Sequence, residues 1–120
     1  MVRGLRGATT VENDIEQAVL EATQALVEEM AKENRVLPVD IISVLISTTT
    51  DIKSAFPAKA VRSIDGWMYV PVICTHEMDV PGAMPSCIRV LMHVNTDIPQ
   101  RYVKHIYQNN AVKLRPDLQK

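Results

Sequence analysis

The chain lacks most of the features that mark specialised classes of protein. Only two of its 120 residues are cysteines, Cys74 and Cys87, and they do not have CxxC spacing. This predicts free thiols rather than a disulfide framework. No apolar run approaches the roughly 20 residues of a membrane-spanning helix, and no signal peptide is expected, because no apolar block follows Arg3 and Arg6. These absences favour a reduced, cytoplasmic protein.

A large net charge is also lacking. The chain has 13 basic and 14 acidic residues, for a net charge of −1, which argues against a protein that tracks nucleic-acid phosphates. The charges are unevenly distributed, since residues 1–50 hold 4 basic and 8 acidic groups and residues 51–120 hold 9 and 6. With 47% hydrophobic and 22% charged residues, the composition is typical of an ordinary globular protein. The length predicts one domain over residues 1–120.

The pattern of apolar residues predicts alternating strands and helices. Asn13 and Glu16 resemble a capping box, and the helix they start is expected to end near Asn34. The β-branched run at 41–47 is typical of a buried strand. Further strands are expected at 1–8, 67–75, 87–94, 106–107 and 111–114. One or two short helices, broken at Phe56-Pro57, are expected within 51–64, another at 97–105, and a mobile tail at 116–120.

This order of elements predicts an α+β fold: a mixed β-sheet with one long and several short helices on one face. A lone sheet of this kind leaves an apolar face or open edges uncovered. Self-association would cover them.

Three arginines occupy strand-like positions beside apolar residues. They are Arg6, Arg89 and Arg115, and Glu77 ends a similar apolar run. A guanidinium group in such surroundings is costly to desolvate unless an anion meets it. Because its planar fork suits a carboxylate or phosphate, the pattern predicts a small, dry, cationic pocket for a multiply anionic ligand.

A series of short motifs carries a family resemblance from Arg3 to Leu118. They are RGLRGATTVE at 3–12, FPAKAVR at 56–62, GW and YVPV within 66–72, Cys74, EMDV at 77–80, CIRV at 87–90, TD at 96–97, HIY at 105–107 and LRPDL at 114–118. In this order they resemble the monofunctional bacterial chorismate mutases of the trimeric α/β class. The resemblance covers nearly the whole chain.

The resemblance implies a homotrimer built as a pseudo α/β barrel, with active sites between subunits. It implies the rearrangement of chorismate to prephenate for phenylalanine and tyrosine synthesis. One C–O bond breaks while one C–C bond forms, so no cofactor, nucleophile or metal is required. Catalysis would come from holding a compact conformer and stabilising charge in the transition state.

Within that implied site, Arg89 would stabilise negative charge on the breaking ether oxygen. Its alternative role is an interface salt bridge. Glu77 would accept a hydrogen bond from the ring hydroxyl and lie near positive charge on the ring, or merely orient Arg89. Arg6 would bind a substrate carboxylate, and the Tyr107 hydroxyl the same or a nearby polar group, although Tyr107 also fits an ordinary strand aromatic.

The remaining implied site residues form the walls of the pocket. Ile73, Cys74, Thr75 and His76 follow one another on a strand, where regular alternation puts residues 74 and 77 on opposite sides. The two residues therefore cannot line the same pocket of one chain, but both can serve if Cys74 lines one pocket and Glu77 lines the neighbouring subunit's pocket. Cys74 is expected to be a neutral wall residue rather than a nucleophile. Phe56, Lys59 and Arg62 would close the pocket, with a solvated basic face as the alternative for Lys59 and Arg62. Leu114 and Arg115 would cover its mouth.

Other functions stay open. The metal-ligand residue types Cys74, His76, Asp79, Cys87, His93 and His105 match no usual zinc spacing, so no metal site is predicted. A non-catalytic trimer that binds a small carboxylate would carry the same cationic residues. A deaminase of reactive imines is a third possibility, since another family of small trimers also places an arginine in an inter-subunit cleft.

Overall fold

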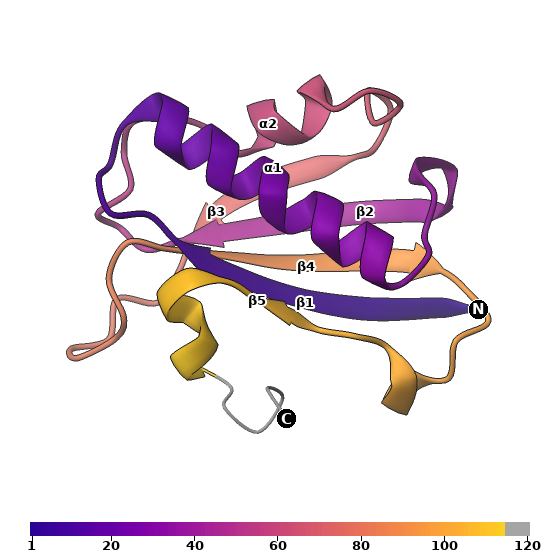
Figure 1. Ribbon diagram of the computed structural model, residues 1–120. Helices are drawn as coiled ribbons and strands as arrows, with labels where there is room; N and C mark the ends of the chain where they lie inside the picture. The colour runs from indigo at the N-terminus through magenta and orange to yellow at the C-terminus, as the bar shows by residue number, and fades with distance from the viewer. Residues whose placement is uncertain (115–120) are drawn as a thin grey trace.

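The computed structural model describes residues 1–114 and contains a five-stranded mixed sheet (Figure 1). Its strands are β1 (Val2–Thr10), β2 (Ile41–Thr48), β3 (Val72–His76), β4 (Cys87–Asn95) and β5 (Ile106–Tyr107), in the order β3-β2-β4-β1-β5. β4 is antiparallel to β1 and β2, whereas β3 is parallel to β2 and β5 to β1. The predicted mixed sheet is confirmed. Arg115 and the predicted tail, 116–120, lie outside the described residues.

Two α-helices lie on the same face of this sheet (Figure 1). They are α1 (Glu16–Glu33) and α2 (Ala58–Ser63), and short 3₁₀ helices span Pro38–Asp40 (η1), Gln100–Tyr102 (η2) and Asn109–Leu114 (η3). Within residues 1–114, no helix combines the length and apolar character that crossing a membrane requires.

The core lies between α1 and the inner residues of the central strands. Alternate positions of β2 and β4 face the helices and are buried, as are the inward residues of α1: Val44, Ile46, Ile88, Val90, Met92, Val94, Val19, Leu26, Val27 and Met30. Gly7 of β1 lies beneath α1, where a Cβ would overlap the sulfur of Met30. The glycine lets the helix approach the strand closely.

α1 ends at Asn34, as the sequence predicts. The buried Asn34 side chain donates to the carbonyl of Met30 at 2.8 Å and to that of Lys104 at 2.9 Å. Its Oδ1 also accepts the Lys104 N–H at 2.8 Å. Asn34 therefore ties the end of α1 to the segment that precedes β5.

The start of α1 differs from the prediction, because no side chain caps its first turn and Ile15 occupies the cap position. The capping box at Asn13 and Glu16 is therefore wrong. Asp14 instead accepts the backbone N–H groups of Lys53 at 2.9 Å and Ser54 at 3.1 Å. The polar residues before α1 serve a tertiary contact rather than the helix terminus.

Two segments are less regular than predicted. Residues 51–57 form no helix, and α2 begins only after Pro57, which disfavours helical geometry in the residue before it. β3 begins at Val72 rather than at residue 67, because residues 67–70 form a turn closed by the Val70 N–H on the Trp67 carbonyl at 3.0 Å. Burial of Trp67 and Val70 holds that turn.

Two strand predictions also need correction. Residues 111–114 belong to the 3₁₀ helix η3, so the described part of the chain has five strands rather than six. β2 is buried on one face only, because Val44 and Ile46 are covered by the helices while Leu45 between them is 40% exposed. Its largely apolar sequence predicted burial on both faces, and within residues 1–114 the second face is left partly exposed.

Candidate active site

The face of the sheet opposite the helices, called here the open face, carries two rows of aligned side chains. Strand register places Ile73, Leu45 and Leu91 side by side across β3, β2 and β4, and these three form the apolar row. Two residues further along, the register aligns Thr75, Ser47, Arg89, Ala8 and Tyr107 across all five strands, and these five form the cavity row.

A cavity of about 360 Å³ lies over the cavity row. Five predicted site residues line it. Four lie on different strands and the fifth, Glu77, directly follows β3; they are Arg6, Thr75, Glu77, Arg89 and Tyr107. Leu45, Ser47, Leu91 and Ala8 also line this open-face cavity, and the sequence reasoning missed them. Only the cross-strand register identifies these residues, because no local motif marks them.

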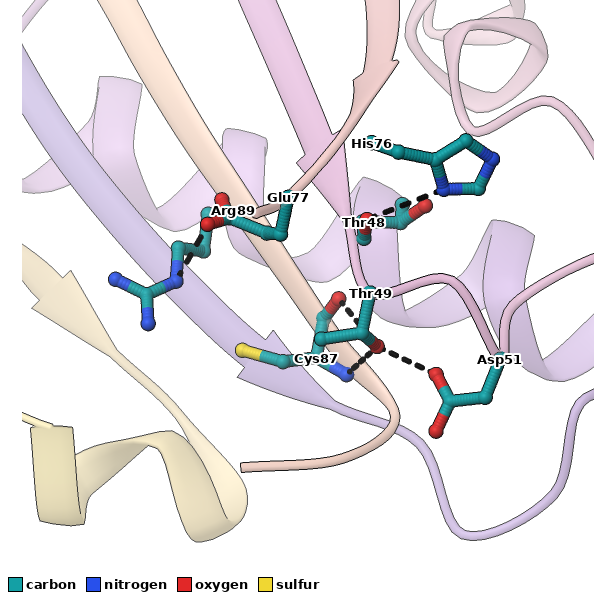
Figure 2. Close-up of polar contacts among 7 residues, drawn as sticks. All are labelled: Thr48, Thr49, Asp51, His76, Glu77, Cys87 and Arg89. Carbon is teal, nitrogen blue, oxygen red and sulfur yellow. Dashed lines mark hydrogen bonds and ion pairs between the residues drawn. The ribbon is translucent and has the colours of Figure 1, made fainter. Parts of the chain in front are cut away.

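Arg89 and Glu77 form an ion pair in this cavity, with 3.7 Å between Nε and Oε1. Figure 2 shows the Arg89 guanidinium extending past the carboxylate. The Glu77 N–H donates to the carbonyl of Thr48 at 2.8 Å, which holds the backbone of Glu77 beside the end of β2. The side chains are 47% and 27% exposed, so solvent screens the pair and its energy is at most about 1 kcal/mol. Both charges can therefore turn to a ligand at little cost.

A second cavity, of about 610 Å³, lies on the helix side of β3. Six predicted site residues line it: Phe56, Lys59, Arg62, Cys74, Thr75 and His76. Lys59 also forms an ion pair with Glu16 at 3.9 Å, between two exposed side chains. This helix-side cavity thus combines three cations (Lys53, Lys59 and Arg62) and the Glu16 carboxylate with an exposed aromatic ring and polar strand residues.

The two cavities separate Cys74 from Glu77, as regular strand alternation predicts. Cys74 points to the helix side, where its sulfur accepts the N–H of Ala58 at 3.3 Å. Its neighbour His76 points away from Glu77 and lies 3.4 Å from the Thr48 carbonyl (Figure 2). Thr75 borders both cavities. One chain therefore presents the predicted site residues as two groups on opposite faces of the sheet.

Two predicted site residues within the described part of the chain belong to neither group. Ile73 is 65% exposed in the apolar row, and Leu114 is partly buried at the end of η3. Neither lines the two cavities described here. Arg115 lies outside the described residues.

A hydrogen-bonded turn after β2 supports the start of β4. The Cys87 N–H donates to Thr49 Oγ1 at 2.9 Å, and the Thr49 hydroxyl donates to Asp51 at 2.5 Å (Figure 2). Asp51 also accepts the Ser86 N–H at 2.9 Å. The Thr49 hydroxyl, followed by the Ser86 N–H, holds the pKa of the Asp51 carboxyl below its ordinary value.

The buried Cys87 lies two residues before Arg89. Burial raises the pKa of its thiol, and the nearby Arg89 charge offsets this only in part. Cys87 is therefore a neutral structural residue at physiological pH. Across residues 1–114, no three histidine, cysteine or acidic side chains come together as a metal site would require.

Comparison with known proteins decides the family. The family model of chorismate mutase type I matches residues 2–118. The chain belongs to this family. It is accordingly a chorismate mutase, an isomerase, and the resemblance seen in its motifs is confirmed.

Curated relatives and a solved structure agree with this assignment. The chain is 52% identical to the chorismate mutase AroH of Bacillus subtilis (strain 168) over 118 residues, which cover 98% of this chain and 93% of that protein. It is 47% identical to the chorismate mutase AroH of Thermus thermophilus, over 99% of this chain and 98% of that protein. A chorismate mutase structure from Clostridium thermocellum has a TM-score of 0.87 and 44% identity, and the match covers 90% of this chain and 96% of that one.

Proposed function

We propose that this chorismate mutase converts chorismate to prephenate, without a cofactor, at sites formed between the subunits of a homotrimer. Each site would combine the open-face cavity of one subunit with the helix-side cavity of the next. The observation that carries the proposal is the division of the site residues between opposite faces of one sheet. A single ligand cannot contact both groups within one chain.

The reaction requires positioning and charge stabilisation rather than covalent chemistry. Chorismate is a dianion whose enolpyruvyl ether bond breaks while a C–C bond forms within the same molecule. A site that holds the compact conformer removes much of the entropic barrier. Fixed donors then stabilise the charge that develops as the ether bond stretches.

Arg89 is proposed to supply the decisive charge. Its guanidinium lies in the middle of the cavity row and would face the ether oxygen, which gains negative charge only as the bond breaks. Such an interaction favours the transition state over the substrate. Glu77, paired with Arg89, would accept the ring hydroxyl and lie beside positive charge on the ring.

The two carboxylates of the substrate need further cations and donors. In the open-face cavity, Arg6 and Tyr107 would bind one of them. In the helix-side cavity of the next subunit, Lys59 and Arg62 offer charge to the other.

The remaining site residues are proposed to wall and cover the pocket. Phe56, Ile73, Cys74, Thr75 and His76 would exclude water from the substrate. Leu114 and Arg115 would cover the mouth once the substrate is bound.

Exposure of the site in a single chain supports assembly. Arg89 is 47% exposed, Phe56 is 78% exposed and the apolar row is uncovered. A dry pocket therefore needs a second copy. A contact between two unlike faces is heterologous, and a ring closed by such contacts needs at least three subunits. We place the enzyme in the cytoplasm, in phenylalanine and tyrosine synthesis.

The test is an assay of purified protein with chorismate, followed by loss of the diene absorbance with and without a chelator. The proposal predicts turnover that is equal in both conditions and is abolished in Arg89→Ala. A carboxylate-binding trimer would instead show ligand-dependent thermal stabilisation without turnover. An imine deaminase would release ammonia from imines and ignore chorismate. Either result would contradict the proposal.

A further inference from the structure

The position of Tyr107 depends on a very short strand. β5 contains only Ile106 and Tyr107, which pair with Gly7 and Ala8 of β1. Because side chains alternate along a strand, a slip of one residue would turn Tyr107 away from the open-face cavity. A two-residue ladder offers little resistance to such a slip, so the register needs additional support.

That support begins where the ladder departs from regular geometry. The Gln108 N–H donates to the Ala8 carbonyl at 2.9 Å, as expected for this parallel register. Two residues earlier, the same register would offer the Lys104 carbonyl to the Arg6 N–H. The Asn34 side chain instead binds both backbone groups of Lys104: its Nδ2 donates to the Lys104 carbonyl, and its Oδ1 accepts the Lys104 N–H. The chain is thereby drawn from β1 towards the end of α1.

His105, which follows Lys104, accepts the hydrogen bond from the Arg6 N–H in place of the Lys104 carbonyl. The Arg6 N–H donates to His105 Nδ1 at 2.9 Å. A backbone amide can only donate, so Nδ1 must carry the lone pair. The His105 ring is therefore neutral, with its proton on Nε2.

We infer, on the basis of the proposed function, that His105 is a positioning residue for the chorismate mutase reaction. Its imidazole joins the backbone of Arg6 on β1 to the chain two residues before Tyr107 on β5. Arg6 and Tyr107 both line the open-face cavity. The contact fixes the spacing of these two groups, and a displacement of about 1 Å at such groups is enough to lower the rate substantially.

Two variants with side chains of nearly equal shape separate the effect of losing the hydrogen-bond acceptor from the effect of losing the imidazole ring. His105→Asn keeps an oxygen acceptor at the position of Nδ1, whereas His105→Leu places a methyl group there. We expect kcat/KM to fall by about tenfold or more in His105→Leu, mainly through KM, and by no more than about threefold in His105→Asn. Circular dichroism and light scattering check that the two variants have the same fold and assembly. Equal kcat/KM in two folded variants would overturn the inference.

A measurement on the unmodified enzyme covers the case in which His105→Leu does not fold. ¹⁵N NMR should show an unprotonated Nδ1 in His105 and a scalar coupling across the hydrogen bond to the Arg6 amide nitrogen. A protonated Nδ1, or no coupling to a resolved Arg6 amide, would overturn the inference. Neither readout depends on catalysis. Absence of turnover in the unmodified enzyme would contradict the proposed function, whereas the NMR result decides the His105 contact separately.

Discussion

The two faces of the sheet differ in how far one chain can complete them. On the helix-covered face, Val44, Ile46 and Val90 are buried against α1 and its neighbours. On the open face, residues between them in the same strands stay exposed, including Leu45 at 40% and Leu91 at 36%. The helix-covered face stabilises the subunit by itself. The open face carries Arg6, Glu77 and Arg89, and under the proposed function it needs another copy to exclude water.

The largest predicted effect is the loss of the positive charge of Arg89 on the open face. Arg89→Gln should lower kcat by at least about 10²–10³, because the neutral amide cannot stabilise charge on the breaking ether bond. Stability should change little, since the Arg89–Glu77 pair is exposed and weak. Steady-state kinetics and thermal unfolding measure the two effects. Arg101→Gln, a change at an exposed arginine that stacks on Tyr102, is the matched control and should keep full activity.

A charge within the apolar row should break the assembly. Leu91→Lys places a cation between Leu45 and Arg6, its partners in the strand register, where a second subunit would have to desolvate it. We expect monomers by light scattering, native circular dichroism and loss of activity. Val39→Lys, at an 86% exposed position in η1, is the control. A stable, active trimer of Leu91→Lys would show that the apolar row is not an interface.

Two glycines of β1 compare the faces directly. In Gly7→Ala the new methyl group meets Met30 beneath α1, so we expect a loss of about 1–3 kcal/mol in the free energy of unfolding. In Gly4→Ala the methyl group meets only Leu91 on the open face, at 3.6 Å, so the change should stay within about 0.5 kcal/mol. Urea denaturation at one fixed protein concentration measures both. Equal losses would contradict the distinction between the faces.

The smallest effect concerns the turn beneath the start of β4. The pKa of Asp51 is lowered from 3.8, so its hydrogen bonds stabilise the fold above that value, and the contribution is lost as pH falls through the lowered pKa. Asp51→Asn should therefore lower the melting temperature slightly at neutral pH, with the difference from the parent shrinking in acid. Asp65→Asn, at an exposed position, is the control. A difference that is constant with pH would contradict this origin.

Local sequence patterns predicted the strands around Arg6 and Arg89 and the end of α1 at Asn34. They failed where tertiary contacts outweigh local preference. The predicted cap at Asn13 is absent and its neighbour Asp14 binds the segment before α2, while Trp67 is buried in a turn rather than a strand. The apolar residues of 41–47 could not reveal that one side of β2 stays uncovered.

The sequence named many of the residues that line the two cavities, but it did not give the whole of their arrangement. Alternation along β3 separated Cys74 from Glu77 in the sequence, and the structure places them in different cavities. Ser47 could not be found in this way, because it joins Arg89 only through the register of β2 with β4. Strand register depends on long-range pairing, which a single sequence does not specify.

The central claim is that each site takes one face from each of two subunits. Mixed trimers of Arg89→Ala and Arg62→Ala test it most directly, because one variant damages the open face and the other the helix-side cavity. Each variant alone should be inactive, and co-refolding equal amounts should restore activity in about a quarter of the sites, where two intact halves meet. Mixtures no more active than the separate variants would contradict the claim.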